Sequence, residues 1–329
     1  GITSEEINKI FFPFINPNIN RLSKLQNLYK IDTKVLSLHS HLYLMTTIKK
    51  LKDLEIILNK SSDKKVLGLV PTMGSLHEGH ISLVKNAVKL CDEVWVSIFV
   101  NPTQFNDIND YKRYPTDLRK DIDKIKSTNQ NVNIFIPNID DIYGLKIFKD
   151  KFDFQDIDKV LEGIKRPGHF DGVGTIVKKL FEIFKPSLVF FGEKDFQQTV
   201  IVQKIIDNYF ENIKMIVCPT VRSKDGLALS SRNSLLSKHA KKNVSVIYDS
   251  LLFAKQNFYK FSSGELKNII KNKIEENEGF VLEYFELRCS KTLKVCSGKN
   301  IKNCCCRAFI CVVVEDVRLI DNLVIINED

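Results

Sequence analysis

The feature of this sequence that most constrains its fold is the alternation of two kinds of segment between residues 46 and 218. Short uninterrupted apolar runs, such as V-L-G-L-V and N-I-F-I-P, are separated by longer segments with helical periodicity. Such strands are typical of a sheet covered on both faces, and their alternation with helices predicts βαβ units around a parallel sheet. The expected strands are 66–70, 93–100, 133–137, 188–191 and 214–218, and the expected helices are 46–58, 78–91, 116–127, 172–184 and 197–210.

The pattern changes after Pro219. A polar segment at 223–233 leads to two helical stretches, and three strand-like runs follow them. Consecutive strands after consecutive helices indicate antiparallel pairing in a smaller α+β domain. We therefore expect an α/β fold, with a Rossmann-like parallel sheet in residues 45–219 and an α+β domain in residues 220–329. The helical stretches are 237–258 and 264–277, and the strands are 284–288, 308–314 and 317–322.

Residues 1–44 precede this pattern and do not share it. They hold five Lys or Arg residues, three acidic residues and short apolar bursts such as I-F-F-P-F-I. We interpret them as an N-terminal extension that is poorly ordered or lies outside the folded protein, and a targeting leader is the alternative. No run of about 18 apolar residues occurs, so we expect no transmembrane helix and no membrane partner.

The charge of the chain limits its partners. The net charge is +9 and the isoelectric point is about 9.0. The lysines are nevertheless scattered among isoleucines and asparagines, and no block of five like charges with interleaved aromatic residues occurs. This distribution is typical of a lysine-rich solvated surface, and we expect no nucleic-acid partner.

Six of the eight cysteines lie between Cys289 and Cys311, in a segment with the triplet C-C-C at 304–306. The segment lacks the paired C-x-x-C spacing of zinc sites, so we interpret these cysteines as small apolar residues of a buried strand. Reduced thiols in a chain of this size favour a cytoplasmic location, with organellar targeting by residues 1–44 as the alternative.

The stretch V-P-T-M-G-S-L-H-E-G-H lies where the first apolar strand meets a helix. Free backbone N–H groups at a helix N-terminus attract phosphate, and Gly74 and Gly79 let a ligand approach the backbone closely. His77 and His80 share one side of the first helical turn and can donate hydrogen bonds to a phosphate as charge develops on it. The spacing H-E-G-H differs from the H-E-x-x-H pattern of zinc proteases.

H-x-G-H at this position is the signature of the nucleotidylyltransferase superfamily, which includes the class I aminoacyl-tRNA synthetases. Further blocks follow it along the chain, namely F-V-N-P-T-Q-F (99–105), R-P-G-H-F-D-G-V (166–173), F-F-G-E-K-D-F-Q-Q (190–198), D-G-L-A-L-S-S-R-N (225–233) and R-L-I-D-N (318–322). With these blocks the sequence resembles the pantothenate synthetase (pantoate–β-alanine ligase) family over residues 66–322. Met45 lies where the family's chain would begin.

The resemblance implies ATP-dependent amide formation. Pantoate and ATP would give pantoyl-adenylate and pyrophosphate, and β-alanine would then displace AMP to yield pantothenate. The resemblance also implies Mg²⁺ as the companion of ATP, held mostly by phosphates and water. It further implies a homodimer formed through the nucleotide-binding domain, and a C-terminal lid that carries a loop similar to K-M-S-K-S.

Catalytic groups follow from the same resemblance. His77, His80, Lys194 and Arg232 match the family's catalytic positions, and His80 is the residue usually described as a proton donor. We interpret His80 as a transition-state donor, because neither half-reaction needs strong acid catalysis at that point. Lys194 supplies a point charge and Arg232 a guanidinium fork for phosphate oxygens.

Binding residues are implied as well. Gln104 and Gln198 match the glutamines that contact pantoate, and Gln104 also lies near β-alanine in this interpretation. Asp121 is the position where the family offers an acidic residue near the metal. The residues implied to bind ATP are Met73, Gly74, Ser75, Leu76, His77, Glu78, Gly79, His80, Gly192, Glu193, Lys194, Asp195, Val221, Leu229, Ser230, Ser231 and Arg232.

Two other functions stay open at this point. One is another adenylyl-transferring enzyme of the superfamily that acts on a different acid or nucleotide, and the two glutamines and R-P-G-H-F-D-G-V speak against it. The other is a synthetase-like RNA-binding protein, which predicts a clustered basic face and no need for Lys194 or His80. The sequence departs from the family at 114–117, where Y-P-T-D replaces Tyr-Pro-Arg-Thr, and this change bears on local contacts rather than on the reaction.

Overall fold

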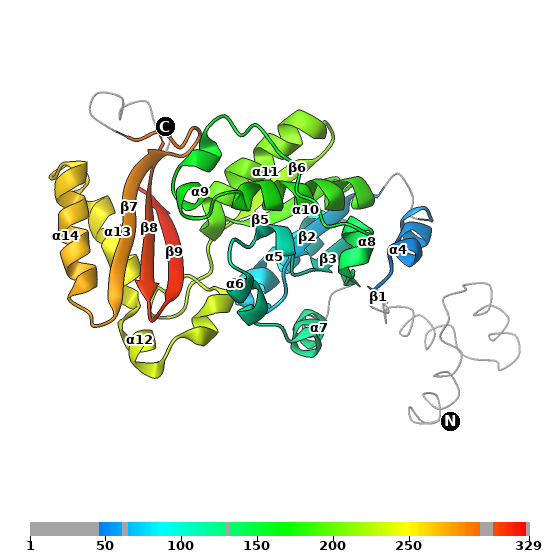
Figure 1. The fold of residues 1–329 in the computed structure, drawn as a ribbon, viewed down its shortest axis with the longest axis horizontal. Coiled ribbons are helices and arrows are strands. Elements are labelled where there is room, and N and C mark those ends of the chain that lie inside the picture. The colour runs from blue at the N-terminus through cyan, green and yellow to red at the C-terminus, as the bar shows by residue number, and fades with distance from the viewer. Residues whose placement is uncertain (1–45, 61–64, 129–131, 297–304, 327–329) are drawn as a thin grey trace, which may run out of the picture. The chain divides into compact units, whose positions relative to one another are not determined.

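The computed structural model describes residues 46–60, 65–128, 132–296 and 305–326. The expectations about residues 1–44 lie outside this part of the chain. The described residues form a larger sheet with helices and a smaller sheet beside it (Figure 1). Among them, no helix combines the length and the hydropathy needed to span a membrane.

Six parallel strands make up the larger sheet, in the order β1-β4-β3-β2-β5-β6. They are β1 (Thr47–Ile48), β2 (Leu67–Thr72), β3 (Glu93–Ile98), β4 (Val132–Phe135), β5 (Leu188–Gly192) and β6 (Lys214–Cys218). The chain runs outward from β2 through β3 and β4, and then crosses back to place β5 and β6 on the other side of β2. The order therefore reverses between β2 and β5, where open α/β sheets bind ligands at the carboxyl ends of their strands.

Helices cover both faces of this sheet (Figure 1). The helices are α4 (Leu51–Leu58), α5 (Glu78–Leu90), α7 (Leu118–Lys126), α10 (His169–Phe184) and α11 (Phe196–Tyr209). Leu69 packs with α4, α10 and α11 on one face, whereas the next residue, Val70, packs with α5 and α7 on the other. Successive strand residues point to opposite faces, so covering both faces requires the uninterrupted apolar strands of the sequence.

A smaller sheet of three antiparallel strands follows, in the order β7-β8-β9. The C-terminal domain consists of β7 (Phe280–Cys289), β8 (Cys306–Val314) and β9 (Val317–Val324) with α12 (Lys238–Asn243), α13 (Ser245–Asn257) and α14 (Ser263–Glu275). Ile310 packs with these helices, whereas Phe309 and Cys311 pack against Ile201 of α11. Both faces of β8 are therefore buried, and Cys306 and Cys311 are fully buried within it.

Short elements connect the larger ones and carry much of the site described below. They are the 3-10 turns η2 (Pro102–Gln104), η3 (Ile157–Lys159), η4 (Glu193–Asp195) and η5 (Ser231–Leu235), and the short helices α6 (Ile108–Arg113), α8 (Ile139–Tyr143) and α9 (Glu162–Lys165).

The predicted fold class is confirmed, with two local corrections. The helix expected at 46–58 begins only at Leu51, because Thr47 and Ile48 form the edge strand β1. Its pairing with β4 includes a hydrogen bond of 2.8 Å from the Ile136 N–H to the Ile48 carbonyl, and local periodicity does not reveal such a distant partner. The helix expected at 237–258 is two helices, α12 and α13.

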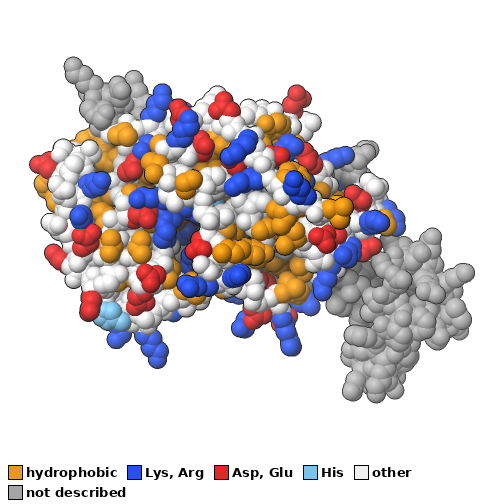
Figure 2. All heavy atoms as spheres, in the orientation of Figure 1, with side chains coloured by type: hydrophobic (Ala, Val, Ile, Leu, Met, Phe, Trp, Pro, Cys, Tyr) orange, Lys and Arg blue, Asp and Glu red, His pale blue; other side chains and the backbone are white. Residues whose placement is uncertain are grey.

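The distribution of charge agrees with the scattered lysines of the sequence. Figure 2 shows one face of the molecule, where Lys and Arg side chains lie among acidic and apolar ones instead of forming a single broad basic patch.

Candidate active site

The H-x-G-H turn and Lys194 meet because their strands are neighbours. β2 leads into the turn at 73–77 and then into α5, whereas β5 leads directly into η4, which carries Lys194. The two strands pair side by side, with Leu69 opposite Val189. Two motifs that are far apart in the sequence therefore leave the same edge of the sheet next to each other.

An acidic residue of α7 fixes the turn between β2 and α5. Gly74 and Ser75 have left-handed φ angles of 82° and 51°. The Asp121 carboxylate accepts the N–H of Ser75 at 2.9 Å and that of Leu76 at 2.7 Å, and Lys124 Nζ donates to the Leu76 carbonyl at 2.9 Å. Left-handed backbone at a residue other than glycine costs about 1–3 kcal/mol, and these bonds hold it in place.

His77 and His80 cap the start of α5 reciprocally. His77 Nδ1 accepts the Gly79 N–H at 3.1 Å, and His80 Nδ1 accepts the His77 N–H at 3.2 Å. The ring centroids are 4.1 Å apart. A ring nitrogen that accepts a hydrogen bond carries no proton, so we assign the proton of each neutral imidazole to Nε2. Each ring then offers one Nε2–H donor on the side opposite the cap.

The surroundings keep both imidazoles neutral. Burial, followed by the positive charge of Lys194, lowers the pKa of His77 to about 4. Burial, followed by His77 and Lys194, lowers the pKa of His80 well below 6.5. Near neutral pH the pair therefore consists of two uncharged donors, which suits stabilisation of an oxyanion better than delivery of a proton.

One pocket gathers most of the residues singled out in the sequence. All four residues assigned to catalysis line it. Its lining includes Met73, His77, Gly79, His80, Gln104, Gly192, Lys194, Asp195, Gln198, Val221, Leu229, Ser230, Ser231 and Arg232. The structure leaves outside this lining Gly74, Ser75, Leu76, Glu78, Asp121 and Glu193.

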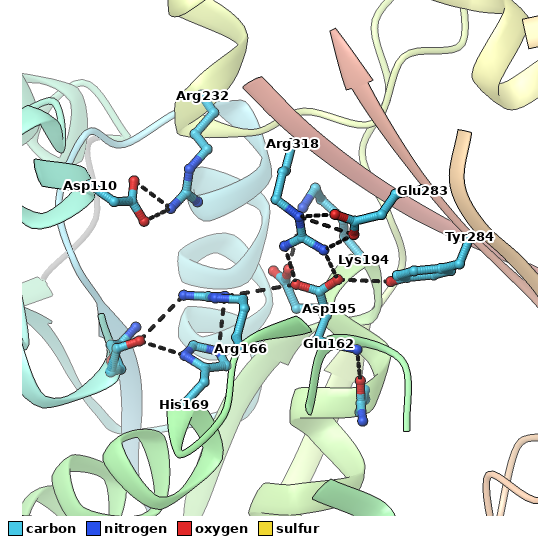
Figure 3. A network of polar contacts seen from close by, with 12 residues as sticks. Asp110, Glu162, Arg166, His169, Lys194, Asp195, Arg232, Glu283, Tyr284 and Arg318 are labelled. Carbon is cyan, nitrogen blue, oxygen red and sulfur yellow. Dashed lines mark hydrogen bonds and ion pairs between the residues drawn. The ribbon is translucent and has the colours of Figure 1, made fainter. Parts of the chain in front are cut away.

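Residues of η5 contact the turn before α5 and the helix α6. Ser231 Oγ donates to the Ser75 carbonyl at 3.0 Å. Arg232 Nη2 lies 3.1 Å from Asp110 Oδ2 of α6, as Figure 3 shows. Lys194 Nζ lies 3.3 Å from Asp195 Oδ1. The two cationic side chains, Lys194 of η4 and Arg232 of η5, therefore approach the pocket from different elements, each with a nearby carboxylate.

Gln104 is held so that its amide nitrogen faces a weak partner. The Asn101 amide nitrogen donates to Gln104 Oε1 at 3.1 Å, and Gln104 Nε2 lies 2.9 Å from Met73 Sδ. Thioether sulfur accepts hydrogen bonds weakly, so a ligand oxygen would be a better partner for this amide. Gln198 lies in the first turn of α11 and lines the same pocket.

The surroundings of Asp121 bear on the predicted Mg²⁺. Both of its oxygens already accept backbone N–H groups, and it is only 4% exposed. The ammonium of Lys124 bonds to Leu76, the residue whose N–H binds Asp121. Mg²⁺ prefers an octahedral shell of oxygens with several waters, and this buried donor set fits it poorly.

Sequence reasoning assigned no role to Arg166 and His169, although both lie in the block R-P-G-H-F-D-G-V. Arg166 Nη2 donates to the Gln104 carbonyl at 3.3 Å, and His169 Nδ1 donates to the same oxygen at 2.7 Å (Figure 3). Burial, followed by the Arg166 charge, lowers the pKa of His169 to about 3. Both residues line the pocket, and the motif itself was the signal that could have found them.

A second network joins the pocket to the C-terminal domain. Glu162 of α9 accepts two hydrogen bonds of 2.8 Å from Arg318 of β9 and one of 2.9 Å from Tyr284 Oη of β7 (Figure 3). Arg318 also pairs with Glu283 at 2.5 Å. The buried carboxylate of Glu162 on α9 is thus paired with an arginine of the smaller sheet.

Known proteins are similar to this chain in sequence and in fold. The family described as Pantoate-beta-alanine ligase matches residues 44–324. The pantothenate synthetase of Flavobacterium psychrophilum is 46% identical over 79% of this chain and 92% of that protein. A pantothenate synthetase structure from Thermus thermophilus, 32% identical, covers 86% of this chain and 100% of its own at a TM-score of 0.78. A Francisella tularensis pantoate-beta-alanine ligase, complexed with beta-gamma ATP and beta-alanine, is 38% identical, with coverages of 85% and 97% and a TM-score of 0.71.

Proposed function

The chain belongs to the pantoate–β-alanine ligase family, and from that premise we propose that it condenses pantoate with β-alanine to pantothenate at the expense of ATP. The observation that supports this most strongly is that His80, Lys194 and Arg232 line one pocket together with Gln104 and Gln198. In this pocket, Lys194, Arg232 and His80 can bind the phosphates of a nucleotide. The side-chain amides of Gln104 and Gln198 can both donate and accept hydrogen bonds, which suits a small hydroxy acid.

The first step joins two anions. A carboxylate oxygen of pantoate attacks the α-phosphorus of ATP, and the bond from that phosphorus to the pyrophosphate oxygen breaks. Lys194 and Arg232 offset the negative charge that gathers on the phosphates, and the Nε2–H groups of His77 and His80 donate to it. No protein nucleophile is required, since catalysis rests on positioning and on charge stabilisation.

The two glutamines bind pantoate in this proposal. Gln104 Nε2 exchanges the Met73 sulfur for a carboxylate or hydroxyl oxygen of the substrate, which is a stronger acceptor. Gln198 approaches the substrate from the first turn of α11. The backbone of Gln104 stays fixed meanwhile, because Arg166 and His169 hold its carbonyl.

The second step forms the amide bond. The amine of β-alanine attacks the acyl carbon of pantoyl-adenylate near Gln104, the acyl–oxygen bond breaks, and AMP leaves while the amine loses a proton. Mg²⁺ would accompany ATP in this proposal, held by phosphate oxygens and water rather than by Asp121, and it would neutralise charge on the triphosphate.

The experiment that tests the function is pyrophosphate release from ATP by the purified chain. Release should require pantoate, and pantothenate should form only when β-alanine is added. Pyrophosphate release at the same rate with and without pantoate would refute the assignment and favour another adenylyl-transferring enzyme. High-affinity RNA binding without any pantoate-dependent release would favour the RNA-binding alternative.

Three further expectations belong with this proposal. We propose that residues 45–219 bind ATP and pantoate while 220–329 act as the lid. We also propose that the chain acts in the cytoplasm.

The third expectation is a homodimer formed through the nucleotide-binding domain. Leu145, Ile147 and Phe148, which follow α8, are exposed apolar side chains, and a dimer contact needs such side chains. Light scattering after size exclusion measures the assembly directly.

A further inference from the structure

The block R-L-I-D-N at 318–322 carries a contact that bears on Lys194. Asn322 lies on β9 and is 3% exposed. Its amide nitrogen donates to the carbonyl of Glu193 at 3.0 Å and to the carbonyl of Lys194 at 2.8 Å. Both N–H hydrogens of the Asn322 amide therefore bond to η4, the short turn that carries Lys194.

Arg307 of β8 fixes the orientation of that amide. Its Nη1 donates to Asn322 Oδ1, and its Nη2 lies 3.0 Å from Glu193 Oε1. The guanidinium sits 3.9 Å from the centre of the Phe196 ring, and Arg307 is 5% exposed. With Oδ1 occupied by Arg307, the amide nitrogen can only face the two carbonyls.

We propose that Asn322, oriented by Arg307, is a positioning residue for Lys194, through which the C-terminal domain sets where the Lys194 ammonium lies in the pocket. This inference rests on the proposed function, since it assigns Lys194 to stabilising the adenylation transition state. Asn322 reaches the Lys194 turn from β9, and an error of about 1 Å in placing a catalytic group costs about 10²-fold in rate.

The chemistry of the contact requires an amide. Two carbonyl oxygens need donors, and the Arg307 guanidinium needs an acceptor, and asparagine supplies both within one small planar group. Asn322→Asp keeps the size but turns acceptor oxygens toward two acceptor carbonyls. Asn322→Ala removes the contact without burying a carboxylate, which keeps the test valid if the aspartate variant unfolds.

The test is a double-mutant cycle on the rate of pyrophosphate release in a single turnover with saturating ATP and pantoate. We expect Asn322→Asp or Asn322→Ala to slow release about 10²-fold in the wild-type background. In the Lys194→Ala background the same variants should slow it less than about 3-fold, because a group that acts through Lys194 has nothing to position once the ammonium is gone. Ser250→Ala is the matched control, since it removes a buried hydrogen bond to Val246 in the same domain, and it should leave the rate unchanged.

A second measurement does not depend on turnover. Lys194 is acetylated with an amine-reactive ester and quantified by peptide mass spectrometry, with the exposed Lys238 as the internal reference. ATP should protect Lys194 at least about 10-fold more in the wild type than in Asn322→Ala, while Lys238 labelling stays alike and circular dichroism shows that both proteins are folded at the assay temperature.

The outcomes separate the two ideas. An equal effect of the Asn322 variants in both Lys194 backgrounds, or unchanged protection by ATP, overturns the positioning role while leaving the ligase assignment intact. Absence of pantoate-dependent release in the wild type overturns the proposed function instead.

Discussion

At the scale of single residues, the histidine pair has its chemistry set by two backbone N–H groups. Each Nδ1 accepts one of them, so the remaining proton lies on Nε2. The low pKa of His77, about 4, follows from burial and then from the Lys194 charge. The same cation that would bind phosphate thus helps to keep its neighbours as neutral donors.

Replacing Lys194 tests the charge at this scale. We expect Lys194→Ala to slow pantoate-dependent pyrophosphate release by about 10²–10³-fold, the usual cost of removing one group that stabilises charge in a transition state. Stopped-flow detection of pyrophosphate measures it. Lys238→Ala is the matched control, because Lys238 is an exposed lysine of α12. A loss smaller than about 3-fold would contradict the role of Lys194.

The histidines also predict how stability depends on pH. Their pKa is lower in the folded chain than the value of 6.5 in the unfolded one, to about 4 for His77 and about 3 for His169. Between pH 6.5 and 4 the unfolded chain binds more protons than the folded chain. The free energy of unfolding should therefore keep its full value above pH 6.5 and fall steadily as the pH drops to 4.

Urea unfolding at a series of pH values measures this slope. His80→Asn keeps an acceptor for the His77 N–H but removes a titrating ring, and it should flatten the slope between pH 6.5 and 4 relative to the wild type. The exposed His239 provides the control, because His239→Asn removes one imidazole and leaves the buried pair intact. Equal slopes in all three proteins would show that His80 is not held neutral by the fold.

At the scale of elements, the helix α7 shapes the loop that precedes α5. Asp121 satisfies two N–H groups of a turn with left-handed residues, and Lys124 holds the Leu76 carbonyl. Helix α7, which does not line the pocket, therefore fixes the loop at the N-terminus of α5, where we propose that phosphate binds.

This arrangement predicts a metal-independent effect of Asp121→Asn. The variant leaves one of two buried N–H groups without an acceptor, at about 1–3 kcal/mol, so the Kd for a non-hydrolysable ATP analogue should rise about 10-fold. Calorimetry should give the same factor with Mg²⁺ and with EDTA. Asp123→Asn, an exposed position of the same helix, is the control. Weakening seen only with Mg²⁺ would restore the role of a metal ligand.

At the scale of the whole molecule, the two sheets are joined by polar contacts beside the pocket as well as by apolar packing. Arg318 reaches from β9 to Glu162 of α9, and Asn322 reaches from the same strand to η4. Ser231 and Arg232 add the contacts to Ser75 and Asp110. The site is complete only when both sheets are in place.

Breaking the Arg318 contact should therefore destabilise the entire fold. Arg318→Met leaves the buried Glu162 carboxylate without its main partner, and we expect a loss of about 3 kcal/mol in the free energy of unfolding. Urea denaturation at pH 7 measures it. The double variant Arg318→Met with Glu162→Gln should recover more than half of the loss. No recovery would show that Arg318 acts through packing alone.

Much of this molecule could be predicted from its sequence, because the patterns involved are local. Uninterrupted apolar runs such as residues 188–191 indicated β5, and the H-x-G-H turn lies at the start of α5 as expected. Strand β1 was missed because its two residues owe their conformation to β4. Arg166 and His169 were missed because their role depends on a carbonyl at Gln104.

The sequence by itself determined the class of fold and the motifs of the site, since periodicity and turn chemistry are properties of neighbouring residues. Only the tertiary structure decided which atoms meet. Several features of the site depend on partners that only the folded chain brings into place. They are the direction of the Gln104 amide, the Nε2 protons of His77 and His80, and the hydrogen bonds from Asn322 to the turn that carries Lys194. Hydrogen bonds are short and directional, so such contacts exist only once packing has placed donor and acceptor together.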